Sequence, residues 1–316
     1  HQVVVLSRHP VTDGSLTVRR RPRRDEEAGS LRRRANSAAS FPLTAAMALL
    51  VTMIGCGSSD PSTGHGIAPS SEEAAEPANR LVPRVVATSP HDTDAFTQGL
   101  ELVDGRLLET TGGYGESDIR EVDRSTGRIL RSTPLEASWF GEGLTAIGGD
   151  RAVQLTWKAG RAMVWDLTTL TTVDVWTYGG QGWGLCLLEP GTLAMSDGSS
   201  FLTLRRSLDL TRIGEVQVLL DGSPVERLNE LECVDGTVWA NVWLTDTIVA
   251  IDPSTGRVAS VVDASGLLAD RSDFGADDVL NGIAHDPASG HFLLTGKRWP
   301  VLFEVVFESA SNQPSD

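Results

Sequence analysis

From about residue 81 onward, short runs of alternating apolar and polar residues are separated by turns rich in Gly, Asp and Pro. Alternation with a period of two is the pattern of a half-buried β-strand, and a pair such as Asp104-Gly105 between two runs indicates a hairpin. The pattern therefore predicts an all-β domain of antiparallel hairpins over residues 81–308, with a disordered tail at 309–316.

One local pattern recurs five times, each time at the start of a predicted strand. A polar or aromatic residue is followed by Gly (by Glu in the fourth copy) and then by an aliphatic residue. Successive copies are 44, 41, 46 and 52 residues apart, a period typical of β-propeller blades. With four predicted strands per repeat, we expect a five-bladed β-propeller of four-stranded antiparallel blades, with a β-sandwich as the alternative. The copies are Thr97-Gln98-Gly99-Leu100, Gly141-Glu142-Gly143-Leu144, Gly182-Trp183-Gly184-Leu185, Leu228-Asn229-Glu230-Leu231 and Leu280-Asn281-Gly282-Ile283.

Two segments depart from the repeat. Residues 81–88 form a predicted strand that precedes the first copy, so we expect it to supply the outer strand of the last blade and close the ring. Residues 264–278 lengthen the last interval. We expect this insertion to hold a short helix on the ring face and to contribute to a pocket, with a solvent-facing loop as the alternative.

The residues at the repeated position should point into one central funnel, because each opens the innermost strand of a blade. Three tryptophans are expected to form a pocket wall rather than core, since a buried indole needs a partner for its N–H. The predicted funnel residues are Gln98, Glu142, Trp183, Asn229 and Asn281 at the repeated position, Trp157, Trp243 and Lys297 at the ends of second strands, and Phe96 at the rim.

Glu142 is the only carboxylate at the repeated position. Neutral amides and indoles around it would desolvate the carboxylate and raise its pKa, which suits a general acid/base at neutral pH. The alternative is a structural ion pair with Lys297 or Arg298. The three histidines of this region, His91, His285 and His291, fall in predicted turns, where we expect solvated imidazoles.

The N-terminal part of the chain has a different composition. Residues 1–55 contain nine Arg against four acidic residues and end in a 15-residue apolar run, which together resemble a basic leader and the core of a signal peptide. Met53-Ile54-Gly55-Cys56 resembles a bacterial lipoprotein signal, in which the cysteine is acylated; an ordinary secretory signal or a buried helix is the alternative. Residues 56–80 are rich in Ser, Gly, Pro and Glu and predict a flexible linker. We therefore expect an extracytoplasmic protein, held by Cys56 at a membrane surface.

Charge and cysteine content exclude some functions. The chain after residue 55 carries 18 basic against 38 acidic residues, which excludes a nucleic-acid partner that needs clustered Lys and Arg. Cys186 and Cys233 could pair, but small buried side chains are the favoured interpretation, because a bridge requires Cα atoms within about 7 Å. The spacing of Cys and His predicts no metal site.

The repeats also carry a resemblance to a known family. Phe96-Thr-Gln-Gly-Leu100, Phe140-Gly-Glu-Gly-Leu-Thr145, Val238-Trp-Ala-Asn-Val-Trp243 and Thr295-Gly-Lys-Arg-Trp-Pro300 resemble, in order and spacing, the plant and bacterial type of glutaminyl-peptide cyclotransferase. The resemblance covers residues 82–307 and implies a five-bladed propeller enzyme without metal or cofactor. It implies that Glu142 is the acid/base and that pocket residues include Phe96, Gln98, Trp157, Trp183, Asn229, Trp243 and Lys297.

The implied reaction is cyclisation of the N-terminal glutamine of peptides or proteins to pyroglutamate, with release of ammonia. Lys297, Asn229 or Gln98 would stabilise the developing oxyanion. A propeller needs no partner to cover its sheet edges, so a monomer is expected. Two alternatives remain at this point: a surface-anchored, non-catalytic binding propeller, and a propeller glycosidase that uses Glu142 with Asp197 or Glu230 as its second carboxylate.

Overall fold

The computed structural model of the protein describes residues 76–272 and 274–312. The predicted leader 1–55, Cys56 and most of the predicted linker 56–80 lie outside the described residues. Within them the chain is all-β, with 22 strands, one 3-10 helix and no α-helix. No helix in this part of the chain has the length and apolar character needed to span a membrane.

Three sheets consist of four antiparallel strands in sequence order. Their innermost strands begin at or next to a copy of the repeated pattern, and the following strands form the predicted hairpins. The sheets are β2 (Thr97–Val103), β3 (Arg106–Thr111), β4 (Asp118–Val122) and β5 (Ile129–Pro134); β6 (Gly141–Gly148), β7 (Arg151–Thr156), β8 (Arg161–Asp166) and β9 (Thr171–Thr177); and β10 (Leu185–Glu189), β11 (Thr192–Met195), β12 (Phe201–Arg206) and β13 (Arg212–Gln217). A small hairpin, β14 (Leu219–Leu220) and β15 (Ser223–Pro224), follows the third sheet.

The remaining strands form an eight-stranded sheet from two four-stranded halves. One half is β16 (Leu228–Val234), β17 (Thr237–Val242), β18 (Thr247–Ile251) and β19 (Val258–Asp263); the other is β20 (Leu280–Asp286), β21 (His291–Gly296), β22 (Val301–Ser309) and β1 (Asn79–Pro90). As the sequence predicts, the N-terminal strand β1 pairs antiparallel with β22 and completes the last repeat. It also pairs in parallel with β19 over three residues, which joins the halves.

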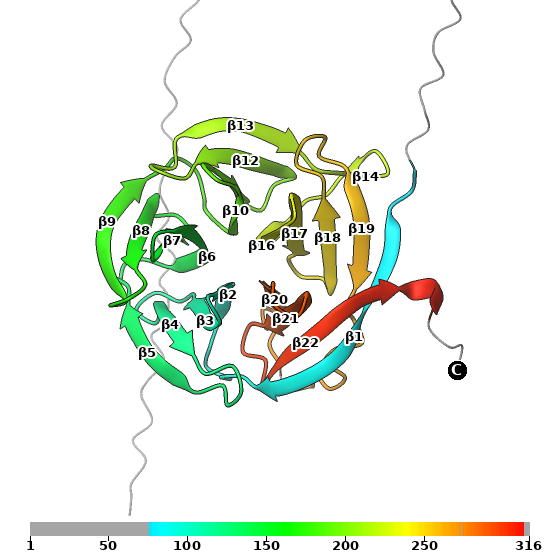
Figure 1. Cartoon of the computed structure of the whole chain (residues 1–316), viewed down its shortest axis with the longest axis horizontal. Helices are drawn as coiled ribbons and strands as arrows, with labels where there is room; N and C mark the ends of the chain where they lie inside the picture. The colour runs from blue at the N-terminus through cyan, green and yellow to red at the C-terminus, as the bar shows by residue number, and fades with distance from the viewer. Residues whose placement is uncertain (1–75, 273, 313–316) are drawn as a thin grey trace, which may run out of the picture. The chain divides into compact units, whose positions relative to one another are not determined.

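The sheets are arranged around a common centre (Figure 1). The innermost strands contact one another in the closed order β2, β6, β10, β16, β20 and back to β2. Each hydrophobic core lies between two neighbouring sheets: Leu108 and Ile119 of the first pack with Leu144, Met163 and Trp165 of the second. Burial of these apolar faces is the main stabilising contribution, and it fixes one sheet against the next.

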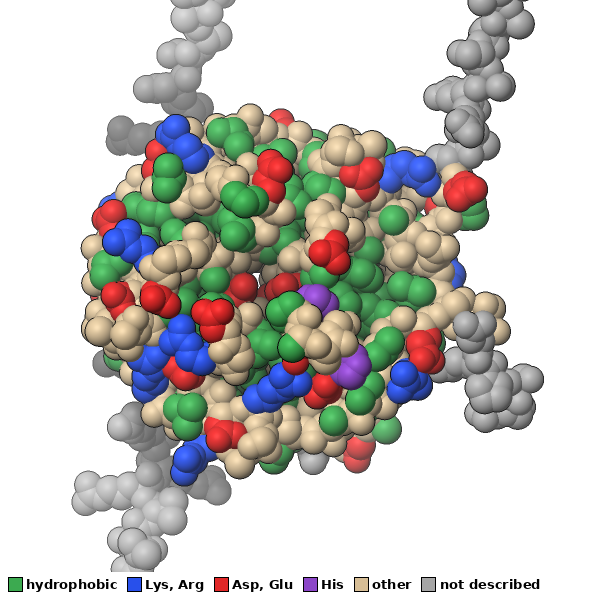
Figure 2. Space-filling model, in the orientation of Figure 1, with side chains coloured by type: hydrophobic (Ala, Val, Ile, Leu, Met, Phe, Trp, Pro, Cys, Tyr) green, Lys and Arg blue, Asp and Glu red, His purple; other side chains and the backbone are tan. Residues whose placement is uncertain are grey.

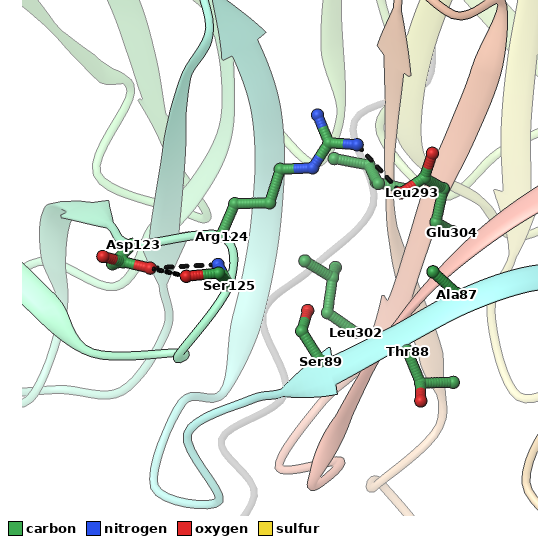
Figure 3. A pocket seen from close by; sticks show the side chains of 9 residues that line it. All are labelled: Ala87, Thr88, Ser89, Asp123, Arg124, Ser125, Leu293, Leu302 and Glu304. Atoms are coloured by element: carbon green, nitrogen blue, oxygen red, sulfur yellow. Dashed lines mark hydrogen bonds and ion pairs between the residues drawn. The ribbon is translucent and has the colours of Figure 1, made fainter.

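Ion pairs strengthen the contact between the first and last sheets. Arg124, in the turn after β4, donates to Asp286 at 2.8 Å and to Glu304 at 2.9 Å. Figure 3 shows its side chain extending toward Glu304 across a cavity of about 460 Å³. Asp123 in the same cavity accepts hydrogen bonds from Ser125. Because these polar groups already have partners, we interpret the cavity as part of the seam that closes the ring.

Two predictions about single segments need correction. Residues 264–278 contain no helix where they are described, and they form turns stabilised by the 2.7 Å ion pair between Arg271 and Asp246. Ser309, predicted to begin a disordered tail, is the last residue of β22 because it pairs with Leu81 of β1, and the 3-10 helix η1 (Ala310–Asn312) follows.

Cys186 and Cys233 form a disulfide, with Cα atoms 5.4 Å apart. The favoured interpretation of two unbridged buried side chains is therefore wrong. The cysteines lie on β10 and β16, innermost strands of consecutive sheets, so ring packing brings them together. Their separation of 47 residues in the sequence does not show that the two cysteines are neighbours in space.

We predict that this disulfide stabilises the ring. A covalent link across 47 residues restricts the unfolded chain, so replacing both cysteines by serine should lower the free energy of unfolding by about 2–4 kcal/mol. Urea denaturation of wild type and the Cys186→Ser, Cys233→Ser double variant measures this. Dithiothreitol should destabilise only the wild type. Equal unfolding midpoints for the two proteins without reductant would contradict the prediction.

Candidate active site

The residues at the repeated position lie where the innermost strands are irregular. A β-bulge changes the direction of a side chain relative to its neighbours, so it can turn a polar residue into the central funnel. Trp183 lies just before β10, outside the strand, at the end of the sheet where β10 begins. Its backbone N–H donates to Ser196 O at 3.0 Å. The register shifts of the other innermost strands include or adjoin Gln98, Glu142, Asn229 and Asn281.

Glycine follows the repeated residue because neighbouring strands approach closely there. The N–H of Gly143 donates to Trp183 O at 2.7 Å, and a Cβ on Gly143 would lie 2.5 Å from the same oxygen. Any side chain would force β6 away from the chain segment before β10. In the fourth copy, Glu230 replaces glycine, and its carboxylate accepts from Leu100 N at 3.3 Å and Ile283 N at 2.8 Å. Glu230 thus links β16 to β2 and β20.

A cavity of about 300 Å³ lies where these residues converge. It brings together side chains from segments that are up to 201 positions apart in the sequence. Eight of the nine predicted funnel residues line it. The lining consists of Phe96, Gln98, Phe140, Glu142, Trp157, Trp183, Asn229, Trp243, Asp277 and Lys297.

Asn281 is the predicted residue that does not line the cavity. It is fully buried, and its Nδ2 donates to Thr97 O at 3.0 Å and to Gln98 Oε1 at 3.2 Å. Asn281 therefore orients the Gln98 amide from behind. The repeated position predicted that Asn281 points toward the centre, but it did not distinguish a wall residue from one that supports the wall.

Two lining residues were missed by the sequence analysis. Phe140 contacts Phe96 edge-on at 6.2 Å and Trp157 at 5.6 Å between ring centroids. A signal for it exists, because Phe140 precedes Glu142 by two residues as Phe96 precedes Gln98. Asp277 belongs to the insertion 264–278. The insertion therefore contributes to the pocket, which confirms one of the two expectations for this segment.

The three tryptophans form one wall and are only partly buried. The Nε1 of Trp157 donates to Gln181 Oε1 at 2.6 Å, and that of Trp183 reaches the same oxygen at 3.4 Å. Trp183 and Trp243 pack edge to face at 5.4 Å. The indole N–H groups of Trp157 and Trp183 are thus held by an amide that does not line the cavity, while the rings do.

Glu142 and Lys297 are the buried charged groups of the cavity, exposed by 5% and 3%. Burial raises the pKa of Glu142 well above its usual value, and the charge of Lys297 only partly opposes this. Burial likewise lowers the pKa of Lys297 to about 8, against the attraction of Glu142 and Asp277. Arg298 pairs with Asp278 at 2.8 Å, so the structural ion pair considered for Glu142 is not formed with Arg298.

A second group of carboxylates lies near the centre but outside the cavity. Burial raises the pKa of Glu101 to about 8 and the pKa values of Glu230 and Glu232 well above the usual range. Figure 2 shows acidic side chains around a central hollow on the face in view.

Asp197 also lies outside the cavity, where its carboxylate accepts hydrogen bonds from Ser199. The described part of the chain has no group of three or more His, Cys, Asp or Glu side chains placed to bind a metal ion.

His91 is buried, contrary to the prediction of a solvated imidazole. Its Nδ1 lies 2.6 Å from Trp299 O and its Nε2 3.0 Å from Glu109 Oε1. A carbonyl and a carboxylate both accept hydrogen bonds, so both ring nitrogens donate and the ring is an imidazolium. Burial alone would lower the pKa of His91, but Glu109, with smaller contributions from Trp299 O and Asp92, raises it.

The His91 pair connects the site to the rest of the first sheet. Trp299 lies two residues after Lys297, and Glu109 Oε1 also accepts from Thr97 at 2.7 Å, next to Gln98. The other two histidines lie in strands and not in turns. His285 lies in β20, and His291 begins β21 and contacts Glu304 at 2.7 Å.

The chain is similar to known proteins over most of the described residues. Residues 61–307 match the family model described as glutamine cyclotransferase. The chain is 38% identical over 233 residues to the glutaminyl-peptide cyclotransferase of Arabidopsis thaliana, which covers 72% of each protein. The crystal structure of Myxococcus xanthus glutaminyl cyclase superposes with a TM-score of 0.68 at 38% identity and covers 74% of this chain and 100% of that one.

We predict that the His91–Glu109 pair stabilises the fold in a pH-dependent way. The pKa of His91 is raised above 6.5 in the folded protein, so its contribution is complete below pH 6.5 and lost as pH rises through the folded value. His91→Gln should cost roughly 3 kcal/mol near neutral to mildly acidic pH and less at alkaline pH. Urea denaturation of both proteins across this range tests it; a difference in unfolding free energy that does not change with pH would count against the pair.

Proposed function

The chain belongs to the glutamine cyclotransferase family, and we propose that it cyclises the N-terminal glutamine of peptides and proteins to pyroglutamate, with release of ammonia. The observation that carries this proposal is one buried carboxylate, Glu142, beside a buried amine, Lys297, in a small cavity walled by indoles. The reaction is inferred from the named relatives, which are glutaminyl cyclases. The cavity contains an acid and an amine that this reaction can use.

The reaction requires one proton acceptor that later becomes a donor. The α-amino nitrogen of the substrate attacks its own side-chain carbonyl carbon, a C–N bond forms and the five-membered lactam closes. The attacking nitrogen loses a proton, the bond to the side-chain amide nitrogen breaks, and that nitrogen takes up a proton and leaves as ammonia. Glu142 is suited to both transfers, because burial raises its pKa toward neutrality.

The other cavity residues bind and orient the substrate. Among the described residues, Lys297 is the one Lys or Arg side chain that lines the cavity, and it stabilises the oxyanion together with Asn229 or Gln98. The indoles of Trp157, Trp183 and Trp243 hold the glutaminyl chain folded and exclude water. The scheme routes no step through a metal ion or cofactor, and we propose that the enzyme is metal-independent.

We further propose a monomeric five-bladed propeller outside the cytoplasm. The closed contact order of the innermost strands supports the five blades, and the Cys186–Cys233 disulfide fits an oxidising compartment. Acylation of Cys56, which lies outside the described residues, would hold the domain at a membrane surface.

The residues of the cavity do not favour the two alternative functions, a glycosidase and a non-catalytic binding propeller. A glycosidase needs two carboxylates that flank one bond, but Asp197 and Glu230 do not line the cavity and have other hydrogen-bond partners. A non-catalytic binding propeller has no need for a buried acid with a raised pKa. Incubation of the purified protein with a Gln-initiated dipeptide distinguishes them, because only a cyclase releases ammonia.

We predict that Glu142→Gln abolishes cyclisation. The amide cannot relay a proton, so kcat should fall by roughly 10²–10⁴-fold, measured as ammonia released from a Gln-initiated dipeptide. The matched control is Glu226→Gln, an exposed position that should retain wild-type turnover. A chelator should leave the wild-type rate unchanged. Near-normal turnover by a folded Glu142→Gln protein would refute the role of Glu142.

We predict a bell-shaped pH dependence of kcat/KM. The rate rises as the substrate's α-amine, with a pKa of about 8, becomes neutral. It falls again as Lys297, whose pKa burial lowers to about 8, loses its charge. Lys297→Met should lower kcat about 10²–10³-fold, and Lys297→Arg, if active, should lack the alkaline decline. An alkaline decline that persists in Lys297→Arg would assign it to another group.

A further inference from the structure

The cavity is small relative to the substrate that we propose. Ligand pockets range from about 300 to 1,000 Å³, and this one, at about 300 Å³, is at the lower limit. The terminal glutamine therefore fills it, and the second residue of a peptide substrate must lie at the rim. This inference rests on the proposed function, and it concerns which residue of the protein the second substrate residue contacts.

Tyr114 extends the aromatic wall of the cavity onto the rim. Its ring packs edge to face on Phe140 at 5.5 Å between centroids, and Phe140 lines the cavity beside Phe96 and Trp157. Tyr114 nevertheless is 57% exposed, and it is the single aromatic among the exposed large hydrophobic side chains of the described residues. An aromatic surface continuous with the cavity is thus open to solvent.

The loop that carries Tyr114 is fixed against the cavity wall. A Cβ on Gly112 would lie 2.6 Å from Phe140 Cζ and 2.9 Å from Gln98 Nε2, so the loop backbone lies directly behind both side chains. Ser117 Oγ donates to Gly113 O at 2.7 Å and accepts from Gly141 N at 2.8 Å, next to Glu142. Gly113 adopts a φ of 124°, which other residues rarely adopt. The position of Tyr114 is therefore set by the same contacts that set Glu142.

Several polar groups near the cavity already have partners. Lys158 lies over the ring of Trp157 at 3.6 Å. Arg298 pairs with Asp278 and lies 4.6 Å from the ring centroid of Phe96. Asp277 is exposed and adds a negative charge. Among these side chains Tyr114 offers an exposed aromatic surface that is continuous with the cavity wall.

We propose that the side chain of the substrate's second residue packs on the exposed face of Tyr114, so that the enzyme favours N-terminal glutamine followed by an aromatic or large aliphatic residue. The contact is a partly exposed aromatic pair, which corresponds to a preference of roughly 5- to 10-fold in kcat/KM over alanine at the second position.

The test compares ammonia release from Gln-Phe-Ala, Gln-Leu-Ala, Gln-Ala-Ala, Gln-Lys-Ala and Gln-Glu-Ala. We expect wild type to favour the Phe and Leu peptides over Gln-Ala-Ala by the stated factor. In Tyr114→Ala the Phe/Ala ratio of kcat/KM should fall close to one, and in Tyr114→Phe it should persist, because the ring and not the hydroxyl makes the contact. Leu208→Ala, at a 74% exposed position outside the site, is the control and should keep the wild-type ratio.

Three results would overturn the inference: equal kcat/KM for the Phe and Ala peptides in wild type, an unchanged ratio in Tyr114→Ala, or a preference for Gln-Lys-Ala, which would place the second residue at Asp277. Each of these leaves the proposed function standing, because ammonia is still released. Absence of ammonia from all five peptides would instead refute the proposed function.

Discussion

The close approach of the innermost strands at the centre of the ring is the constraint on which the site depends. At Gly143 the backbone of β6 donates directly to Trp183 O, so no side chain fits between them. A strand in such a position cannot keep regular pairing with its own hairpin partner, and the ladder is interrupted at Glu142. The bulge frees this residue from the alternation of the strand and turns it into the funnel. Close packing and a polar centre are therefore two consequences of one geometry.

The same geometry explains why the cavity is electrostatically unusual. Glu142 and Lys297 come from different sheets and reach one small space whose other walls are aromatic rings and amides. Each group loses hydration there, so the pKa of the acid rises and the pKa of the amine falls, and their mutual attraction offsets only part of the change. Burial therefore shifts the pKa of the acid upward and that of the amine downward, and general acid/base catalysis favours such a shift of the acid. This state costs stability, and the interfaces between sheets, the β1–β22 pairing and the disulfide offset it.

The sequence predicts the parts of this structure that repeat. Five copies of one pattern, 41 to 52 residues apart, locate the innermost strands, and the repeated position identifies Gln98, Glu142, Trp183 and Asn229 as cavity residues. Features that depend on contacts between repeats are not encoded in the spacing. The Cys186–Cys233 bridge and the burial of His91 both arise from how one sheet packs on another. Asn281 shows what the repeated pattern cannot predict. It occupies the repeated position, as expected, but its side chain contacts Gln98 and does not line the cavity.

The buried imidazolium of His91 shows how far the support of the site extends from the cavity. Its two ring nitrogens hold Trp299 O, in the turn that carries Lys297, and Glu109, whose carboxylate also binds Thr97 beside Gln98. The turn and the strand belong to the last and the first sheet, which meet where β20 contacts β2 and where β1 completes the last sheet. A charged group that is buried at this junction must keep its partner, so any loosening of the closure would expose the pair and release the Lys297 turn. Ring closure and placement of the cation are therefore coupled through one hydrogen-bonded pair, although neither His91 nor Glu109 lines the cavity.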